Sequence, residues 1–334
     1  EGYAPSDIPG LILKHNLYGM EIDERAASLA AFALTMKARS RSRRFFKKQV
    51  EPNIQRIAPI AFKEDEVAEL NDLYQVNLDS MVWNTYAKAD VYGSLIQPPQ
   101  ELVDLAASAP ESADGIETLF DPLLREHAED VFAQTRCLAR KYAAVVANPP
   151  YMGAKNMSAE LKQFVQDRYE DGKADLFAAF IMRNRQFLRH NAMLGMITMQ
   201  SWMFLSSFED LRRNLLASSA IETMSHLGAG AFDSIGGEVV STNAFTLRNS
   251  PSSGKGIYIR LVDVSGDSNQ ADACAEAING DANYRFEVNQ HEFAQIPGSP
   301  IVYWLSEAVF KVFDRKIAKG AGGDALSDIA DVAQ

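Results

Sequence analysis

The sequence predicts an α/β fold built on a mostly parallel, doubly wound sheet. Short apolar runs that are typical of buried strands alternate along the chain with segments whose apolar residues recur at helical spacing. The length of 334 residues and a hydrophobic content of 47% allow a large core, in one big domain or two. Both observations favour an open sheet with helices on its faces.

The first third of the chain predicts one strand followed by helices. We expect a short buried strand over residues 16–22, and a helix capped by Asp23 after it. Residues 50–83 mix apolar and acidic residues and predict helices outside the sheet. Three prolines within residues 95–115 indicate an irregular crossing, and a helix-rich region follows over 116–141.

The rest of the chain alternates between strand and helix signals. A glycine-rich turn is expected between two of the strands, and the pattern changes after residue 265. Strands are expected over 142–147, 193–198, 221–227, 238–247 and 256–264, and helices over 158–169, 175–190, 208–217 and 305–318.

An asparagine, two prolines and a tyrosine follow the apolar run 142–147. Their position at a strand end places Asn148 at the carboxyl edge of the sheet, where ligands of open α/β sheets bind. Pro149 and Pro150 stiffen the backbone and have no N–H, so nearby carbonyls stay free to accept hydrogen bonds. The Asn148 side-chain oxygen and the Pro149 carbonyl can then hold one planar amino group, while Tyr151 offers an aromatic face to a base. These features predict methylation of an exocyclic amine.

The predicted chemistry follows from the weak nucleophilicity of an adenine amino group, whose lone pair is delocalised into the ring. Two acceptors that hold its hydrogens localise the lone pair on nitrogen, which can then attack a sulfonium methyl group. Because this nitrogen lies inside a duplex, the base must be flipped out and held by stacking. No covalent enzyme intermediate is needed.

Two carboxylates are candidates for binding a cofactor. Glu21 ends the first expected strand and precedes a helix, a position from which a carboxylate accepts hydrogen bonds from ribose hydroxyls. Asp90 is expected at a sheet edge, where it can accept the amino group of a cofactor adenine. The alternatives are a solvent-exposed strand end for Glu21 and the start of a turn for Asp90.

The charge distribution is uneven. The net charge of −11 is unusual for a protein that touches DNA through surface charge alone, so basic character must be local. A solvated helix face and a phosphate-contacting surface are equally good interpretations of the one basic run. Its members are Lys37, Arg39, Arg41, Arg43, Arg44, Lys47 and Lys48, together with Phe45 and Phe46. Two cysteines far apart and five scattered histidines predict a reducing cytoplasm and give no support for a metal site.

In this order the segments resemble the gamma-class adenine-N6 DNA methyltransferases. The resemblance implies a Rossmann-like sheet that binds S-adenosyl-L-methionine, mostly parallel with an antiparallel last strand, and with helical insertions over about 40–88 and 97–140. It also implies that an aromatic residue sandwiches the flipped base, for which Phe245 is the candidate and core packing the equal rival. The matching segments are Met20-Glu21-Ile22-Asp23 (motif II, ribose), Asp90 (motif III, adenine), Asn148-Pro149-Pro150-Tyr151 (motif IV, catalysis) and Asp175-Leu176-Phe177 (motif V).

Three further segments are very similar to the PglX-type methyltransferases of BREX phage-defence systems. This resemblance implies methylation of host DNA at a non-palindromic site, with a flipped adenine in double-stranded DNA as substrate and other BREX proteins as partners. The segments are Tyr151-Met152-Gly153-Ala154-Lys155, Gly236-Gly237-Glu238-Val239-Val240 and Ile296 to Trp304.

The family pattern is incomplete in this chain. The glycine-rich motif I and the first strand, which should precede Glu21, are absent, and the first residue is not methionine. We expect residues 1–265 to form the catalytic core and residues 266–334 a connector toward a target-recognition domain that begins near Leu326 to Val332. An internal piece of this kind is expected to be inactive alone and to lack tight cofactor binding and sequence-specific DNA binding.

Two other functions share parts of this pattern. Asn-Pro-Pro-Tyr also serves methylation of a glutamine amide in protein, although the long insertion and the BREX-like segments argue against it. The chain can also be a non-catalytic scaffold of a defence complex that binds DNA or partners, which the retained Asn148 and Tyr151 argue against.

Overall fold

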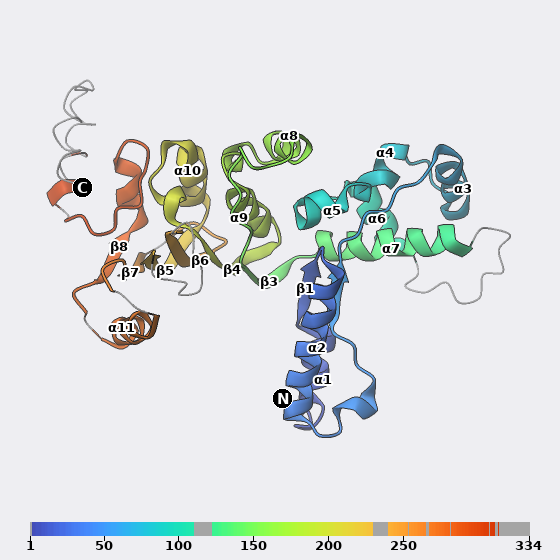
Figure 1. Ribbon diagram of the computed structural model, residues 1–334, viewed down its shortest axis with the longest axis horizontal. Coiled ribbons are helices and arrows are strands. Elements are labelled where there is room, and N and C mark those ends of the chain that lie inside the picture. The colour runs from blue at the N-terminus through green and yellow to red at the C-terminus, as the bar shows by residue number, and fades with distance from the viewer. Residues whose placement is uncertain are drawn as a thin grey trace. The chain divides into compact units, whose positions relative to one another are not determined.

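The protein divides into two compact units in the computed structural model, Glu1–Arg140 and Lys141–Gln334. The first unit contains a two-stranded sheet and the second a six-stranded sheet, each accompanied by helices (Figure 1). The predicted α/β class is confirmed. In the described part of the chain, no helix is both long enough and apolar enough to cross a bilayer. The structure describes residues 2–109, 122–229, 240–252, 254–264, 267–280, 282–306, 308–310 and 313.

The first unit is organised around a parallel pair of strands. β1 (Tyr18–Glu21) pairs with β2 (Asn53–Arg56), and the turn after β1 leads directly into a helix. The Asp23 side chain accepts a hydrogen bond from the Ala26 N–H at 2.8 Å, which confirms the predicted helix cap. The longer helices are α1 (Ile8–His15), α2 (Glu24–Arg41), α3 (Glu64–Tyr74), α6 (Gln100–Ser108) and α7 (Pro122–Ala139), with short turns α4 (Ser80–Trp83) and α5 (Ala89–Tyr92).

The expectation of helices throughout residues 50–83 is wrong at β2. This strand has only one large apolar residue, Ile54, so it lacks the alternation that marks a strand. The Ile54 side chain lies beside Gly19 in β1, where an added Cβ would be 2.6 Å from the Ile54 Cδ1. The absence of a side chain in one strand therefore makes room for a side chain in its neighbour.

The irregular crossing expected over residues 95–115 contains a regular helix, α6. The prolines lie before this helix, with Pro99 at its N-cap, where they do not interrupt its hydrogen bonds. Leu102, Leu105 and Ala106 are buried at helical spacing and hold α6 in the core of the first unit. Residues 110–121 lie outside the described part of the chain.

The six strands of the second unit are ordered β3-β4-β6-β5-β7-β8. β3, β4, β5 and β7 share one direction, while β6 and the last strand, β8, run the other way. This arrangement confirms the predicted mostly parallel sheet with an antiparallel last strand. The strands are β3 (Tyr142–Ala147), β4 (Leu188–Met199), β5 (Ala220–Gly228), β6 (Thr242–Arg248), β7 (Lys255–Arg260) and β8 (Arg285–Asn289).

One face of this sheet carries the main core of the second unit. Figure 1 shows α9 (Leu176–Gln186) and α10 (Glu209–Ser218) on the same side of the sheet, and α11 (Asp267–Asn279) on the other side near β7. Apolar residues of α9 and α10 pack against β4, β5 and β6 in one buried cluster. α8 (Ala159–Arg168) begins at Ser158, whose side chain accepts from the Leu161 N–H. The helices predicted near these positions are confirmed.

The prediction that the strand before Asn148 is buried is wrong. Among the described residues, β3 lies at the edge of the sheet and pairs with β4 alone, and Val146 is 85% exposed. Val146 belongs to the sheet face opposite the core cluster, together with Gly195 and Ile197 of β4. A run of apolar residues does not show whether one or both faces of a strand are covered.

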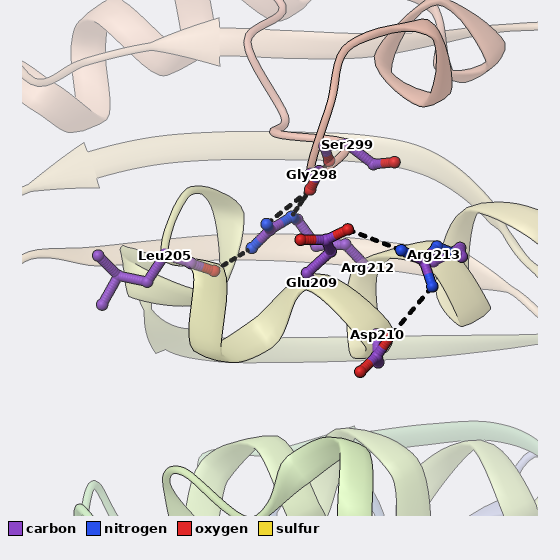
Figure 2. Close-up of polar contacts among 7 residues, drawn as sticks. All are labelled: Leu205, Glu209, Asp210, Arg212, Arg213, Gly298 and Ser299. Carbon is purple, nitrogen blue, oxygen red and sulfur yellow. Dashed lines mark hydrogen bonds and ion pairs between the residues drawn. The ribbon is translucent and has the colours of Figure 1, made fainter. Parts of the chain in front are cut away.

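A buried arginine joins α10 to the segment Ile296 to Trp304. The guanidinium of Arg212 donates to the carbonyls of Gly298 at 2.6 and 3.0 Å and of Ser299 at 3.1 Å, and also to those of Trp202 and Leu205. Figure 2 shows the Arg212 side chain directed at Gly298, while the neighbouring Arg213 is directed at two carboxylates of its own helix. Burial lowers the pKa of Arg212 from its ordinary value. Arg212 therefore fixes a segment that is distant in sequence.

His226, near the end of β5, lies in a second polar contact with the same segment. Its Nδ1 lies 2.9 Å from the Tyr303 hydroxyl, and its Nε2 lies 2.7 Å from the Gln200 side-chain oxygen. Trp304 stacks on the imidazole at 6.3 Å between ring centroids, and the Arg260 guanidinium lies over Trp304. Burial, together with the charge of Arg260, lowers the pKa of His226 to about 4. The imidazole is therefore neutral in the folded protein at pH 7.

Lowering the pH is expected to destabilise the protein through His226. The pKa of a histidine is about 6.5 in the unfolded chain and about 4 here, so the unfolded state binds more protons between these values. The neutral imidazole of His226 contributes up to roughly 3 kcal/mol to the free energy of unfolding. This contribution is complete above pH 6.5 and is lost as the pH falls to about 4. Urea unfolding of the wild type and of His226→Gln, at pH 7.5 and at pH 5, measures this loss of stability. Equal losses of stability in the two proteins would refute the assignment.

Candidate active site

Asn148 directly follows β3 and is exposed. It borders a pocket of about 460 Å³ that is lined by residues of β3, β4, β5 and β6. The Tyr151 hydroxyl donates to the Asn148 side-chain oxygen at 3.4 Å, a long and therefore weak hydrogen bond. The amide is directed outward beside an open cavity, and its oxygen can accept from an incoming amino group.

The two prolines give this turn its acceptor. Pro149 is buried and Pro150 is exposed, and neither has an N–H to donate. Within the described part of the chain, no group donates a hydrogen bond to the Pro149 carbonyl. The turn thus presents two oxygen acceptors close together in sequence, one on a side chain and one on a stiff backbone.

Tyr151 is half-buried, and its ring packs against α9. Its ring meets the ring of Phe177 in α9 edge-on, with centroids 6.3 Å apart and an angle of 89° between planes. Burial raises the pKa of the Tyr151 hydroxyl above its ordinary value, so the side chain is neutral at pH 7. A perpendicular contact of this kind covers at most one face of the Tyr151 ring.

Asp175 links the turn to α9, a role that the sequence did not reveal. One carboxylate oxygen accepts from the Phe177 N–H at 3.3 Å as a helix cap and from the Met152 N–H at 3.0 Å. The Leu176 N–H donates a hydrogen bond to the Met152 carbonyl, and Gly153 forms a β-bridge with Asp175. Burial raises the pKa of Asp175, and these backbone donors oppose the rise. The residues after Asn148 are therefore held by the start of α9.

Replacing Asp175 by alanine is expected to loosen the catalytic turn. The change leaves two N–H groups without their acceptor, which costs about 1–3 kcal/mol of stability, whereas Asp175→Asn keeps an acceptor oxygen and loses less. Urea unfolding and methyl transfer are measured for both variants. Asp167→Ala, at an exposed position of α8, is the control. A stable and fully active Asp175→Ala protein would show that the turn does not depend on this carboxylate.

Glu21 ends β1 as predicted. One of its carboxylate oxygens accepts from the backbone N–H groups of Ile22 at 2.8 Å and Asp23 at 3.0 Å. These bonds fix the carboxylate at the strand end. The other oxygen has no hydrogen bond to the described residues. Next to it is a pocket of about 810 Å³ that is lined by Ile22, Asp23 and Arg56, among others. A free carboxylate oxygen and the exposed Ile22 side chain beside this pocket fit a ribose and an adenine ring.

Asp90 does not lie at a strand end, contrary to our expectation. It is exposed in the first turn of the short helix α5. After this helix, Gly93 adopts a φ of +51°, and a Cβ there would lie 2.9 Å from the Ile22 Cγ2. The segment that carries Asp90 therefore packs against the turn that carries Glu21 and Ile22. The first unit brings the three predicted cofactor-binding residues into one region.

The Phe245 side chain is 3% exposed and packs edge-on against Trp202, with ring centroids 5.1 Å apart. It belongs to the main core cluster on the helix-covered face of the sheet. This position favours core packing over stacking against a base. The glycine segment predicted before it, Gly236 to Val240, lies outside the described residues except for Val240.

Residues 15–232 match the model of the Eco57I restriction-modification methylases. The chain belongs to this family. It is 36% identical over 347 residues to the adenine-specific methyltransferase BrxX of Escherichia coli O9:H4 (strain HS), covering 96% of this chain and 28% of that protein. It is 34% identical to the adenine-specific methyltransferase PglX of Lacticaseibacillus casei (strain Zhang), covering 92% of this chain and 26% of that one. The chain thus spans about a quarter of the length of these curated relatives.

The relatives confirm the resemblance that the motifs predicted. One similar solved structure is that of the Type ISP restriction-modification enzyme LlaGI in complex with a DNA substrate mimic. The match covers 90% of this chain and 26% of that one, with 14% identity and a TM-score of 0.45. The match to the methyltransferase subunit of the type I restriction-modification system from Streptococcus thermophilus covers 90% of this chain and 58% of that one, with 13% identity and a TM-score of 0.40.

Proposed function

We propose that this chain carries the catalytic core of an S-adenosylmethionine-dependent adenine-N6 DNA methyltransferase of a BREX-type phage-defence system. The observation that carries the proposal is the exposed Asn148 amide, beside an open pocket, within a turn that also offers the Pro149 carbonyl and the Tyr151 ring. The adenine-specific methyltransferases among its relatives support the choice of base. The expected role is to mark host DNA, with other BREX proteins as partners.

In this proposal the turn binds and activates the amino group of a flipped adenine. Asn148 and Pro149 each accept one N–H of the amino group, and Tyr151 stacks on the ring of the extruded base. Because the two acceptors draw the hydrogens out of the ring plane, the nitrogen lone pair becomes available for bond formation. As the nitrogen takes the methyl group, the bond between that methyl and the sulfonium sulfur would break and leave a neutral thioether, and the methylated nitrogen would then release one proton to solvent. Tyr151 replaces its weak contact with Asn148 by stacking.

The cofactor-binding residues proposed are Glu21, Ile22 and Asp90. Bound S-adenosyl-L-methionine would supply an electrophilic methyl group on its sulfonium. The free Glu21 oxygen would accept a ribose hydroxyl, and the Ile22 side chain would cover the adenine ring. The exposed Asp90 carboxylate would accept the adenine amino group. Isothermal calorimetry on the complete gene product, with Glu21→Gln and Asp90→Asn, tests these roles by a loss of cofactor affinity.

Mass spectrometry of nucleosides separates this function from its alternatives. The complete gene product is incubated with duplex DNA and cofactor, and the digested nucleosides are analysed alongside peptides of the proteins present. The proposal expects N6-methyladenine in the DNA. A methylated glutamine without modified DNA would support protein methylation, and the absence of both products would support a scaffold.

A further inference from the structure

The structure assigns a second surface of the first unit to DNA. We propose that the basic run at the end of α2 binds the phosphate backbone of double-stranded DNA without reading its sequence. The inference rests on the proposed function, because it names a surface that would hold the same duplex. We call this surface the basic turn. It consists of Lys37, Arg41, Arg43, Arg44 and Lys47.

The charge of the basic turn stands out against the rest of the chain. Residues 37–48 hold seven of the 33 lysines and arginines and no acidic residue, in a protein with a net charge of −11. An acidic surface repels DNA, so a duplex must be held by local positive charge. Favourable interaction with the α2 dipole accounts for cations in its last turn, Arg39 and Arg41. It does not account for Arg43, Arg44 and Lys47, which lie beyond the helix.

The cations of the basic turn are available to a ligand. Of the seven basic residues, Lys48 pairs with Asp7, and the Arg39 guanidinium lies over the Phe46 ring at 5.8 Å. The other five are exposed and form no ion pair with any described residue. Cations that serve only the fold often pair with acids, and among the described residues these five have no such partner.

The backbone that presents these cations is fixed. Phe45 is buried in a cluster with Leu13 of α1 and Ala38 of α2, and the helix ends at the buried Ser42. The Phe45 N–H bonds to the Ser42 carbonyl and the Lys47 N–H to the Arg44 carbonyl, both at 3.0 Å. An anchored turn holds its charges in place before a duplex arrives, which reduces the entropic cost of binding.

Salt-dependent binding to DNA tests the basic turn in the complete gene product. The variant replaces Arg41, Arg43, Arg44 and Lys47 by glutamine, and the control replaces four scattered exposed lysines, Lys63, Lys162, Lys173 and Lys255, by glutamine. Both proteins lose the same total charge. Fluorescence anisotropy with a labelled duplex gives the dissociation constant over a range of salt concentrations. Thermal unfolding of both proteins checks that the fold is retained.

The basic-turn variant is expected to bind duplex at least about tenfold more weakly than the control at 0.1 M salt. Its slope of log K against log[salt] should be shallower by roughly 2–4, because each phosphate contact contributes about 0.9. Equal slopes in variant and control would overturn the inference. The inference would also be overturned if the basic-turn variant lost binding to anionic lipid vesicles while its binding to the duplex was unchanged. If the wild type forms no N6-methyladenine at all, the proposed function fails, whatever the slopes show.

Discussion

Replacing Asn148 by alanine is expected to reduce adenine methylation by at least about 10²-fold while the stability of the fold is unchanged. In the proposed mechanism the amide oxygen is one of two acceptors that hold the reacting amino group, and removing one group of such a pair typically costs that much in turnover. Because the side chain is exposed and its hydrogen bond to Tyr151 is weak, its removal leaves no buried group unsatisfied. Methyl transfer to duplex DNA and urea unfolding, measured on the complete gene product, test both halves of this expectation.

Variants at two positions separate the amide from the ring beside it. Asn148→Asp keeps an oxygen acceptor and should retain more activity than the alanine variant. Tyr151→Phe keeps the stacking face and should lose little, whereas Tyr151→Ala should weaken base binding by roughly 1–3 kcal/mol. A fully active Asn148→Ala protein would contradict the proposed chemistry at its first step.

Replacing Arg212 by methionine is expected to cause the largest loss of stability of any single change considered for this protein. Arg212 is 1% exposed and donates to four backbone carbonyls. Two belong to Trp202 and Leu205, which precede α10, and two belong to Gly298 and Ser299 in the segment Ile296 to Trp304. Methionine fills a similar volume and leaves the carbonyls of Trp202, Gly298 and Ser299 without donors, at a cost of about 3–5 kcal/mol, whereas the Leu205 carbonyl still accepts from the Phe208 N–H. Urea unfolding measures the difference.

The neighbouring arginine supplies a matched control. Arg213 pairs with Glu209 at 2.6 Å and Asp210 at 3.0 Å on the surface of α10, and exposed pairs of this kind contribute at most about 1 kcal/mol (Figure 2). Arg213→Met should therefore be nearly neutral. If the two variants lose equal stability, the contacts of Arg212 with Gly298 and Ser299 do not hold the segment in place.

The strands and helices that were predicted well have local signals in the sequence. Asp23 and Ser158 cap their helices through short-range hydrogen bonds, so a few residues suffice to predict them. The strand before Asn148 was placed correctly because its apolar run is also a local signal in the sequence. Its exposure was not, because burial depends on what covers each face, and that is decided by residues far away in sequence.

Long-range contacts limit what the sequence reveals about the site. The link from Asp175 to Met152 spans 23 residues, and the fit of Ile54 over Gly19 joins two strands separated by a helix. Phe245 was an equal choice between core and stacking from its sequence, and only its burial and its contact with Trp202 in the structure favour the core. The tetrapeptide from Asn148 to Tyr151 was recognisable because it is contiguous. The elements that hold it are not.

The structure of the complete gene product bound to a duplex that contains its target adenine is the most direct test of the proposed mechanism. The measurement is the distance from the adenine N6 atom to the Asn148 side-chain oxygen and to the Pro149 carbonyl oxygen. We expect the base to be flipped, with both distances at about 2.7–3.2 Å and the base stacked on Tyr151. An adenine that stays in the helix, or a flipped base whose N6 is directed away from both oxygens, would contradict the account.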